Sequence, residues 1–297
     1  MTMVIAHSRP DGIVWSFNGV GATFVGPAAA LTDDLPSSVS AFTWLTGTQT
    51  TASVFELTGD WVTPCKPGLA GFSNLLLPVG TLVKVSWRRS TDGPGVYPLV
   101  LNSLNPGNAQ RIFQGPRGER TALHLLDAHN SSNIVGVKFS IFNDVNGAPL
   151  IPAAAQWWTG EALVYQTTYL DIEAEWTATP VDTTVANYSP QRQPSIDPGL
   201  VYHQLAFRLP WDSQRNYYGH PTDPTAIDYE SLMAKLDRGK TALYIPRYLD
   251  EDGTFSAHML HRTAKLGVMS KLPAPTHRNG PYFDSSPITV METPIPT

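Results

Sequence analysis

The sequence predicts a mainly β fold, and three observations support this prediction. Hydrophobic residues alternate with polar ones at a period of two in most apolar runs, as in strands with one buried face. The chain holds 23 glycines and 26 prolines, 49 of 297 residues, scattered without a period, which predicts many turns. These residues leave little room for long helices, and the apolar stretches are far shorter than the roughly 20 residues of a membrane span. We therefore expect no membrane insertion.

The chain is expected to begin with strands. Residues 13–17 and 22–25 are separated by Asn18-Gly19-Val20-Gly21, which is typical of a hairpin turn between β-prone runs. Later short runs, each bounded by Gly, Pro, Asn, Asp or Ser, lie at 41–45, 53–57, 82–87, 97–101 and 133–142. In the run 82–87, the alternation places Val83, Val85 and Trp87 on one face, so we expect these three side chains in the core.

The run 168–177 alternates in the same way, with acids at every second position. Asp171, Glu173 and Glu175 are expected to form a line along one face of a sheet, where like charges oppose one another. One interpretation is a solvated face or an edge protected against aggregation. The other is a charged interface strand that meets arginines of a neighbouring subunit or binds a hard cation.

Residues 179–199 change in composition to Thr, Pro, Ser, Gln and Asp with little apolar clustering. We interpret them as a Pro-rich linker or extended arm between two domains. The first domain, 1–178, is predicted to be a β-sandwich of the jelly-roll or galectin-like kind. The second, 200–297, is predicted to be a smaller α+β domain with one short helix.

That helix is expected at 228–238. Tyr229, Leu232, Met233 and Leu236 recur at spacings of three and four, and Gly239 follows as a C-terminal stop. Strands are expected to resume in the runs 241–246, 260–270 and 288–291.

Composition excludes several functional classes. Charged residues make up 15% of the chain, against roughly 25% in average soluble proteins, and the net charge is −5. Lysines and arginines form no run that would grip a phosphate backbone, so nucleic acid is not an expected partner. The single cysteine, Cys65, cannot form an internal disulfide or a cysteine cluster. Residues 1–10 lack a secretory pattern, which predicts synthesis in a cytosol.

Catalytic patterns are also missing from the sequence. It contains no Gly-x-Ser-x-Gly motif and no P-loop or dinucleotide-binding motif. His124 and His129 are five residues apart, and His258 and His261 lie in a strand-like run where odd spacing sends them to opposite faces. We therefore expect no metal site, no cofactor and no catalytic residues. The acids 250–252 precede Gly253 and are expected in a solvated hairpin turn.

Two aromatic pairs, Trp157-Trp158 and Tyr217-Tyr218, have three interpretations: core, subunit interface or carbohydrate platform. Adjacent side chains on a strand point to opposite faces, so one of each pair is expected outside. This expectation favours an interface, with glycan contact as the alternative.

Four stretches carry a resemblance to a known family: 241–248 (TALYIPRY), 260–268 (LHRTAKLGV), 282–290 (YFDSSPITV) and 73–85 (SNLLLPVGTLVKV). They resemble the minor tail proteins, including distal tail and baseplate-hub components, of long non-contractile-tailed bacteriophages (siphophages). Together the four stretches hold 39 of the 297 residues. Distal tail proteins commonly place the ring-forming module first, whereas the helix-containing module comes last here.

The resemblance implies a structural virion protein at the tail tip, made in the host cytoplasm. It would form a symmetric ring, a homo-oligomer between tail tube and receptor-binding apparatus, in contact with other tail proteins. Low charge and apolar β surface agree with permanent interfaces. Two alternatives stay open: a carbohydrate-binding module in which Trp157 or Trp158 stacks on host surface glycan, and a polysaccharide hydrolase that uses Asp171, Glu173 or Glu175.

Overall fold

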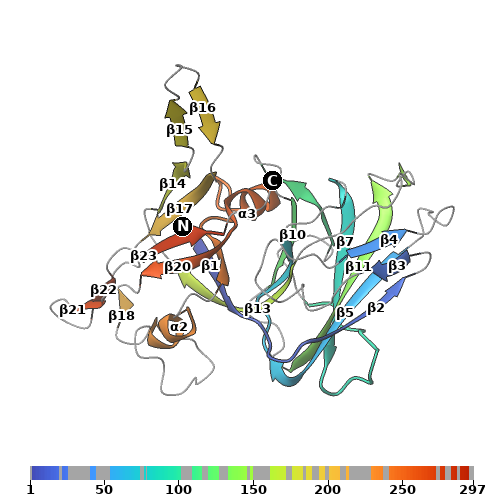
Figure 1. Ribbon diagram of the computed structural model, residues 1–297. Coiled ribbons are helices and arrows are strands. Elements are labelled where there is room, and N and C mark those ends of the chain that lie inside the picture. Colours follow the sequence, from blue (N-terminus) through green and yellow to red (C-terminus); the bar gives the residue numbers. More distant parts are fainter. Residues whose placement is uncertain are drawn as a thin grey trace. The chain divides into compact units, whose positions relative to one another are not determined.

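The computed structural model (Figure 1) describes residues 2–19, 22–25, 41–44, 54–73, 77, 79–101, 109–115, 120–126, 133–145, 148–149, 161–171, 176–182, 185–188, 194–197, 201–207, 212–213, 229–236, 241–271, 275–277, 282–285 and 288–293. In these residues the fold is mainly β, as predicted, with several antiparallel sheets and two helices. No helix in the described ranges is long and apolar enough to cross a membrane.

The chain divides into two compact units whose parts alternate along the sequence. Unit 1 contains Met1–Ile5, Tyr169–Pro246 and Lys265–Thr297, and unit 2 contains Ala6–Thr168 and Arg247–Ala264. These boundaries differ from the consecutive domains predicted at 1–178 and 200–297. The difference has a plain topological origin, since the chain leaves each unit and later returns to it.

Unit 2 is built around a large antiparallel sheet. Its strand order is β2-β5-β11-β7-β8, with β12 paired to the end of β11. The strands are β2 (Val14–Gly19), β5 (Val54–Cys65), β7 (Thr81–Arg89), β8 (Ala109–Arg111), β11 (Ile134–Val145) and β12 (Ala148–Pro149).

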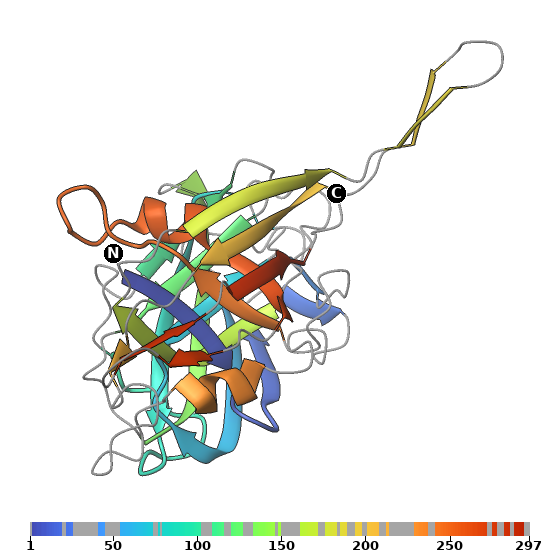
Figure 2. The same cartoon turned by 90° about the vertical axis from the view of Figure 1, so that its left-hand side faces the viewer.

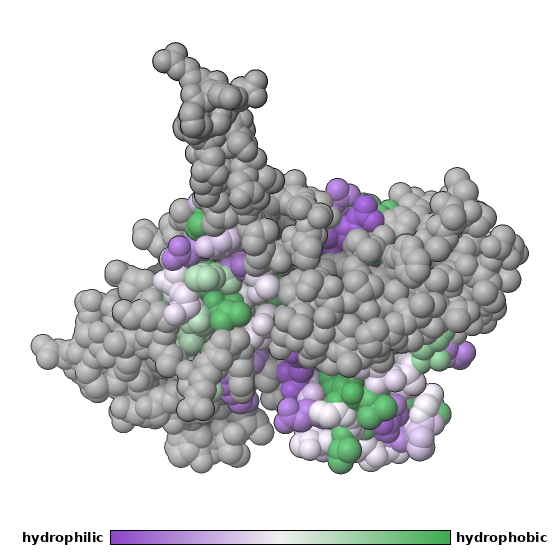
Figure 3. Space-filling model, viewed as in Figure 1, coloured by the Kyte–Doolittle hydropathy of each residue, from purple (hydrophilic) through white to green (hydrophobic). Residues whose placement is uncertain are grey.

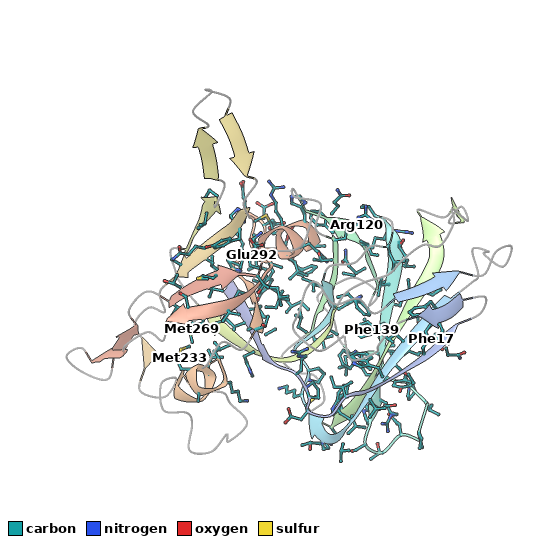
Figure 4. The ribbon with its side chains drawn as sticks, in the orientation of Figure 1. Phe17, Arg120, Phe139, Met233, Met269 and Glu292 are labelled. Atoms are coloured by element: carbon teal, nitrogen blue, oxygen red, sulfur yellow. The ribbon has the colours of Figure 1, made fainter. Side chains whose placement is uncertain are left out.

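The alternation read from the sequence decides which face of this sheet is buried. Val83, Val85 and Trp87 of β7 are at most 4% exposed, as predicted, whereas Lys84 between them is exposed. They pair with Ile141, Phe139 and Val137 of β11, and these residues pair in turn with β5. The buried face is therefore continuous from β7 to β5. Figure 4 shows Phe17 and Phe139 among the side chains of this unit.

A second group of strands in unit 2 has the order β13-β6-β10-β9. Phe72 of β6 meets Phe139 of β11 with ring centroids 4.4 Å apart, and Ala122 and Leu126 join the same core. The core thus takes side chains from both groups of strands. The strands are β6 (Leu69–Ser73), β9 (Phe113–Gln114), β10 (Arg120–Leu125) and β13 (Glu161–Asp171), whose last residues belong to unit 1.

Unit 1 contains an antiparallel series with the order β14-β17-β23-β20-β19, next to the first residues of β1. A long strand pair, β14 with β17, forms its outer side (Figure 2). The strands are β1 (Thr2–Ser8), β14 (Trp176–Asp182), β17 (Val201–Phe207), β19 (Thr241–Ile245), β20 (Lys265–Lys271) and β23 (Ile288–Glu292).

Smaller ladders complete the described strands. β15 pairs with β16, β22 pairs with β18 and β21, and β3 pairs with β4. Their bounds are β3 (Ala22–Val25), β4 (Ala41–Trp44), β15 (Val185–Tyr188), β16 (Pro194–Asp197), β18 (Asp212–Ser213), β21 (Pro275–His277) and β22 (Tyr282–Ser285).

The helix predicted at 228–238 is present as α2 (Tyr229–Leu236), with Leu232, Met233 and Leu236 buried. A second helix, α3 (Ala257–Thr263), corrects two predictions: the single helix and the strand beginning at residue 260. Ser256 caps α3 by accepting a hydrogen bond from the Met259 amide at 3.3 Å, and β20 begins after the helix. His258 and His261 therefore lie one turn apart on one side of a helix, rather than on opposite faces of a strand.

Glu292 joins three strands of unit 1. Its Oε2 accepts a hydrogen bond from the His203 amide at 2.8 Å on β17, and its Oε1 lies 3.4 Å from Lys265 Nζ on β20. The residue is 9% exposed. Removing one partner of such a pair leaves the other charge buried without compensation, which is strongly destabilising.

We expect Glu292→Ala to lower the free energy of unfolding by about 3 kcal/mol, because Lys265 loses its counter-charge and the His203 amide loses its acceptor. Urea unfolding followed by far-ultraviolet circular dichroism measures the change. Met291→Ala is the matched control, since Met291 is 45% exposed and its truncation is expected to change stability by less than about 0.5 kcal/mol. Equal effects of the two substitutions would contradict the role assigned to Glu292.

Candidate interaction surface

Most of the site residues proposed from the sequence lie outside the described residues. This applies to Trp157, Trp158, Tyr217, Tyr218, Glu173 and Glu175. Asp171 is the last residue of β13, and its side chain is likewise outside the description. The charged strand and the aromatic contacts therefore stay predictions.

A polar network lies on the face of the large sheet opposite the core. Asp60 of β5 accepts two hydrogen bonds at Oδ1 from Arg88 of β7, at 3.0 Å from Nε and 2.8 Å from NH2. At Oδ2 it accepts a third from the Tyr97 hydroxyl at 2.8 Å. The carboxylate is thus held by two strands and a loop, and charge-assisted bonds of this kind are stronger than neutral ones.

Gly136 of β11 makes room for this network. It lies between Asp60 and Arg88 in the ladder, and a Cβ built there would stand 2.3 Å from Asp60 Oδ1 and 3.1 Å from the Tyr97 ring. Gly59 serves the opposite face in the same way, where a Cβ would meet the Trp15 ring at 2.7 Å. A glycine inside a strand often marks close approach by another group, and here that group is an aromatic ring on each face.

The same polar face continues along the strands with further paired side chains. Lys138 Nζ lies 3.0 Å from Glu56 Oε1, and the Ser16 and Thr58 hydroxyls are hydrogen bonded to each other. Lys84 Nζ stands 4.9 Å from the centre of the Phe142 ring. These groups satisfy one another, so the polar face is ordered by its own contacts.

The end of the sheet near Asp60 also carries exposed valines. Residues 61–64 of β5 lie opposite the single residue Val135, so β5 bulges there, anchored by the bond from Trp61 Nε1 to the Ile134 carbonyl at 3.0 Å. On the bulge, Val62 is 90% exposed. Val14 is 70% exposed, Val96 is 53% exposed and Val100 is 60% exposed.

These four valines neighbour residues of the Asp60 network in the ladders or along the chain. Val14 pairs with Asp60 in the ladder, Val62 lies two residues beyond it, and Val96 precedes Tyr97. Val100 follows Leu99, which forms a β-bridge with Trp87 beside Arg88. Figure 3 shows apolar side chains, in green, among polar ones at the lower edge of unit 2. We call Val14, Val62, Val96 and Val100 the valine surface.

A second feature is a pair of ladders in and around residues 179–199, which the sequence predicts to be a linker or extended arm. β14 and β17 pair from Trp176↔Phe207 to Asp182↔Val201, and β15 and β16 form a further ladder from Val185↔Asp197 to Tyr188↔Pro194. In Figures 1 and 2 this second ladder is drawn beyond the ends of β14 and β17. We call the β15–β16 ladder the ribbon arm.

The sequence analysis did not single out Asp60, Tyr97 or the valine surface. One signal was available for the network: glycines 59 and 136 interrupt otherwise alternating strands, which indicates a bulge or a close approach. Valine exposure had no such signal, because the bulge depends on the register between β5 and β11. Within the described residues, no group of three or more His, Cys, Asp or Glu side chains is arranged to hold a metal ion.

Comparison with known proteins returned no match: no family model, no curated protein and no solved structure is similar to this chain. Its function is therefore argued from its own residues.

Gly136→Ala is expected to lower the free energy of unfolding by about 2 kcal/mol, because the new methyl group displaces the Asp60 carboxylate and the Tyr97 ring. Chemical denaturation measures the loss. Gly93→Ala is the control, since its nearest neighbour to an added Cβ is a Val96 methyl at 3.8 Å, an ordinary contact. A tolerated alanine at 136 would show that the network adapts.

Burial, followed by the hydrogen bond to Asp60, raises the pKa of Tyr97 to about 12 from the ordinary value of 10.0. A raised folded-state pKa gives stabilisation that is complete below pH 10 and is lost as pH rises toward 12. We expect Tyr97→Phe to reduce the loss of stability between pH 10 and pH 12 and to cost about 1 kcal/mol at pH 7. Denaturation midpoints across this pH range measure both effects, and parallel pH curves for the two proteins would refute them.

Proposed function

We propose that this chain is a structural subunit of a larger assembly, and specifically a component of a bacteriophage tail tip that forms a symmetric ring, as the sequence resemblance implies. The observation that carries the proposal is the valine surface. Four valines, each more than half exposed, neighbour residues of the hydrogen-bonded network of Asp60, Arg88 and Tyr97 in the ladders or along the chain.

Such a surface has the properties of an interface. Single exposed apolar residues are common on proteins, but apolar residues grouped in one region and bordered by polar groups indicate a contact site. The Asp60 network already fixes the backbone around them, so little ordering entropy opposes association. The aliphatic valine side chains offer dispersion contact and lack hydrogen-bonding groups that would recognise a polar ligand.

The ribbon arm supports the same role. A two-stranded ribbon is at best marginally stable alone in water, so a partner surface that covers it stabilises it. A subunit that lends such an arm to a neighbour makes a heterologous contact, and heterologous contacts close into rings when their rotation permits.

Changing Val62 and Val100 to Ser tests the valine surface. We expect the double variant to keep the fold and to lose assembly, with at least a tenfold weaker association, because two apolar contacts worth about 1 kcal/mol each are removed. Light scattering at several concentrations gives the mass. Val79→Ser is the matched control, because Val79 is 41% exposed before the opposite end of β7.

A wild-type chain that stays monomeric at every concentration, with and without purified tail components, overturns the proposal. A double variant that assembles as well as wild type moves the interface elsewhere on the chain.

Replacing residues 183–200 with Asn-Gly tests the ribbon arm. Asp182 and Val201 are paired, so a two-residue turn can join β14 directly to β17. We expect unchanged circular dichroism and melting temperature for the rest of the chain, together with a smaller mass in solution. Retention of the full assembly would show that the arm does not hold it together.

A further inference from the structure

Residues 247–264 form a compact excursion between two paired strands. β19 and β20 are joined by the ladder from Thr241↔Val268 to Tyr244↔Lys265, and the excursion leaves this ladder after Pro246 and returns at Lys265. Both flanking strands belong to unit 1, whereas the excursion itself belongs to unit 2. The ladder therefore anchors both of its ends.

The excursion is closed by its own hydrogen bonds. Asp250 Oδ1 accepts from the Asp252 and Thr254 amides at 3.1 and 2.9 Å, which fixes the exposed turn. The Ser256 amide donates to the Tyr248 carbonyl at 2.9 Å, just before α3 begins. Thr263 Oγ1 donates to the Arg247 carbonyl at 2.6 Å and so joins the two ends. These contacts hold the excursion together from within.

The excursion meets β10 through a histidine whose protonation state is fixed by geometry. His261 Nε2 accepts a hydrogen bond from the Leu123 amide at 3.1 Å. Its Nδ1 stands 2.6 Å from the Ala257 carbonyl, which can only accept, so Nδ1 carries the hydrogen. Both ring nitrogens are then used by the neutral imidazole. A proton added at Nε2 would place two donors face to face.

The neighbouring histidine on β10 has no such arrangement. His124 is 1% exposed, and neither of its ring nitrogens has a hydrogen-bond partner among the described residues. A buried polar group without a partner is destabilising, and a charged one is more so. The ring of Phe113, on β9, lies 5.4 Å from that of His258 and 5.6 Å from that of His261. His261 thus stands at the contact between α3 and β10, whereas His124 lies on the face of β10 that carries Ala122 and Leu126 of the core.

Burial lowers the pKa of His261 to about 4, with a further contribution from His258, while the Ala257 carbonyl opposes the shift. Burial, followed by the charge of His261, lowers the pKa of His124 to about 3. None of the groups that shift these two values is a carboxylate. Three arginines of the packed elements donate to backbone carbonyls: Arg111 to Gly80, Arg120 to Leu77 and Arg247 to Leu249. Asp250 is held within its own turn, and Glu251, Asp252, His258 and Arg262 are exposed. Neither β6 nor β9 contains a titratable residue.

We propose that residues 247–264 are an acid-sensitive latch, docked on β10 while His261 is neutral and released when it accepts a proton. This inference is independent of the proposed assembly function.

Release is reversible because the β19–β20 ladder keeps both ends of the latch in place. In the released state the His261 imidazole reaches water and recovers ordinary affinity for protons, near pH 6.5. Docking is therefore fully stabilised above that pH and weakens as pH falls toward the lowered value. His261 makes the opening constant rise about tenfold per pH unit in this window.

Hydrogen–deuterium exchange of the full chain at pH 7 and pH 4.5, with rates divided by the intrinsic rate at each pH, tests the latch. Peptides covering 120–126 and 257–263 are expected to lose at least about tenfold of their protection at pH 4.5. A peptide covering 137–142 in β11 is expected to keep its protection. Unchanged protection in the first two peptides, or a parallel loss in all three, overturns the proposal.

His124→Leu with His261→Gln gives the second test. Glutamine retains an acceptor for the Leu123 amide, and neither new side chain titrates, so the difference between pH 7 and pH 4.5 is expected to vanish. His258→Gln is the matched control: it lies exposed on the same helix and is expected to leave the difference in place. If the double variant misfolds, the wild-type comparison and the His258 control still decide the question. A pH response that persists in a folded double variant also overturns the latch.

Discussion

The packing of Phe139 against Phe72 is the contact on which unit 2 depends. It joins the large sheet to the β6–β10 strands and lies in a core to which β5, β7 and β11 contribute alternating side chains, among them Leu57, Val85 and Val137. Because strand side chains have a period of two, committing one face to the core leaves the other face to polar groups. The positions of the Asp60 network and the Lys138–Glu56 pair both follow from that division. The core thus determines which side chains of these strands face outward.

Sequence periodicity is sufficient for this part of the fold. Val83, Val85 and Trp87 were expected inside, and they are buried because their alternation matches the pleat of β7. The helix at 229–236 also follows from spacing alone, since its apolar stripe satisfies the helical period. Both patterns are local, so a single stretch of sequence contains all the information needed.

The rest depends on partners distant in sequence. The Asp60 network joins β5, β7 and a loop. A glycine inside a strand indicates a close approach, but the local sequence does not indicate that Tyr97 is the residue that approaches Gly136. The strand predicted from residue 260 is wrong over 260–263, which belong to α3, and the start of this helix depends on the Ser256 cap. His261 illustrates the same limit, since its role depends on the Leu123 amide 138 residues earlier in the chain. Interleaving of the two units is likewise a long-range property that composition does not encode.

The Asp250 turn offers a place at which this chain can be tagged. It is held by bonds that close locally, its acids are solvent-exposed, and Gly253 supplies the positive φ of 76° that ends it. Exposed turns of this kind accept inserted sequence with little effect on the body that carries them. A short epitope placed between Glu251 and Asp252 would therefore give an antibody a defined point of attachment, and its position in electron micrographs would mark unit 2 in an assembled particle.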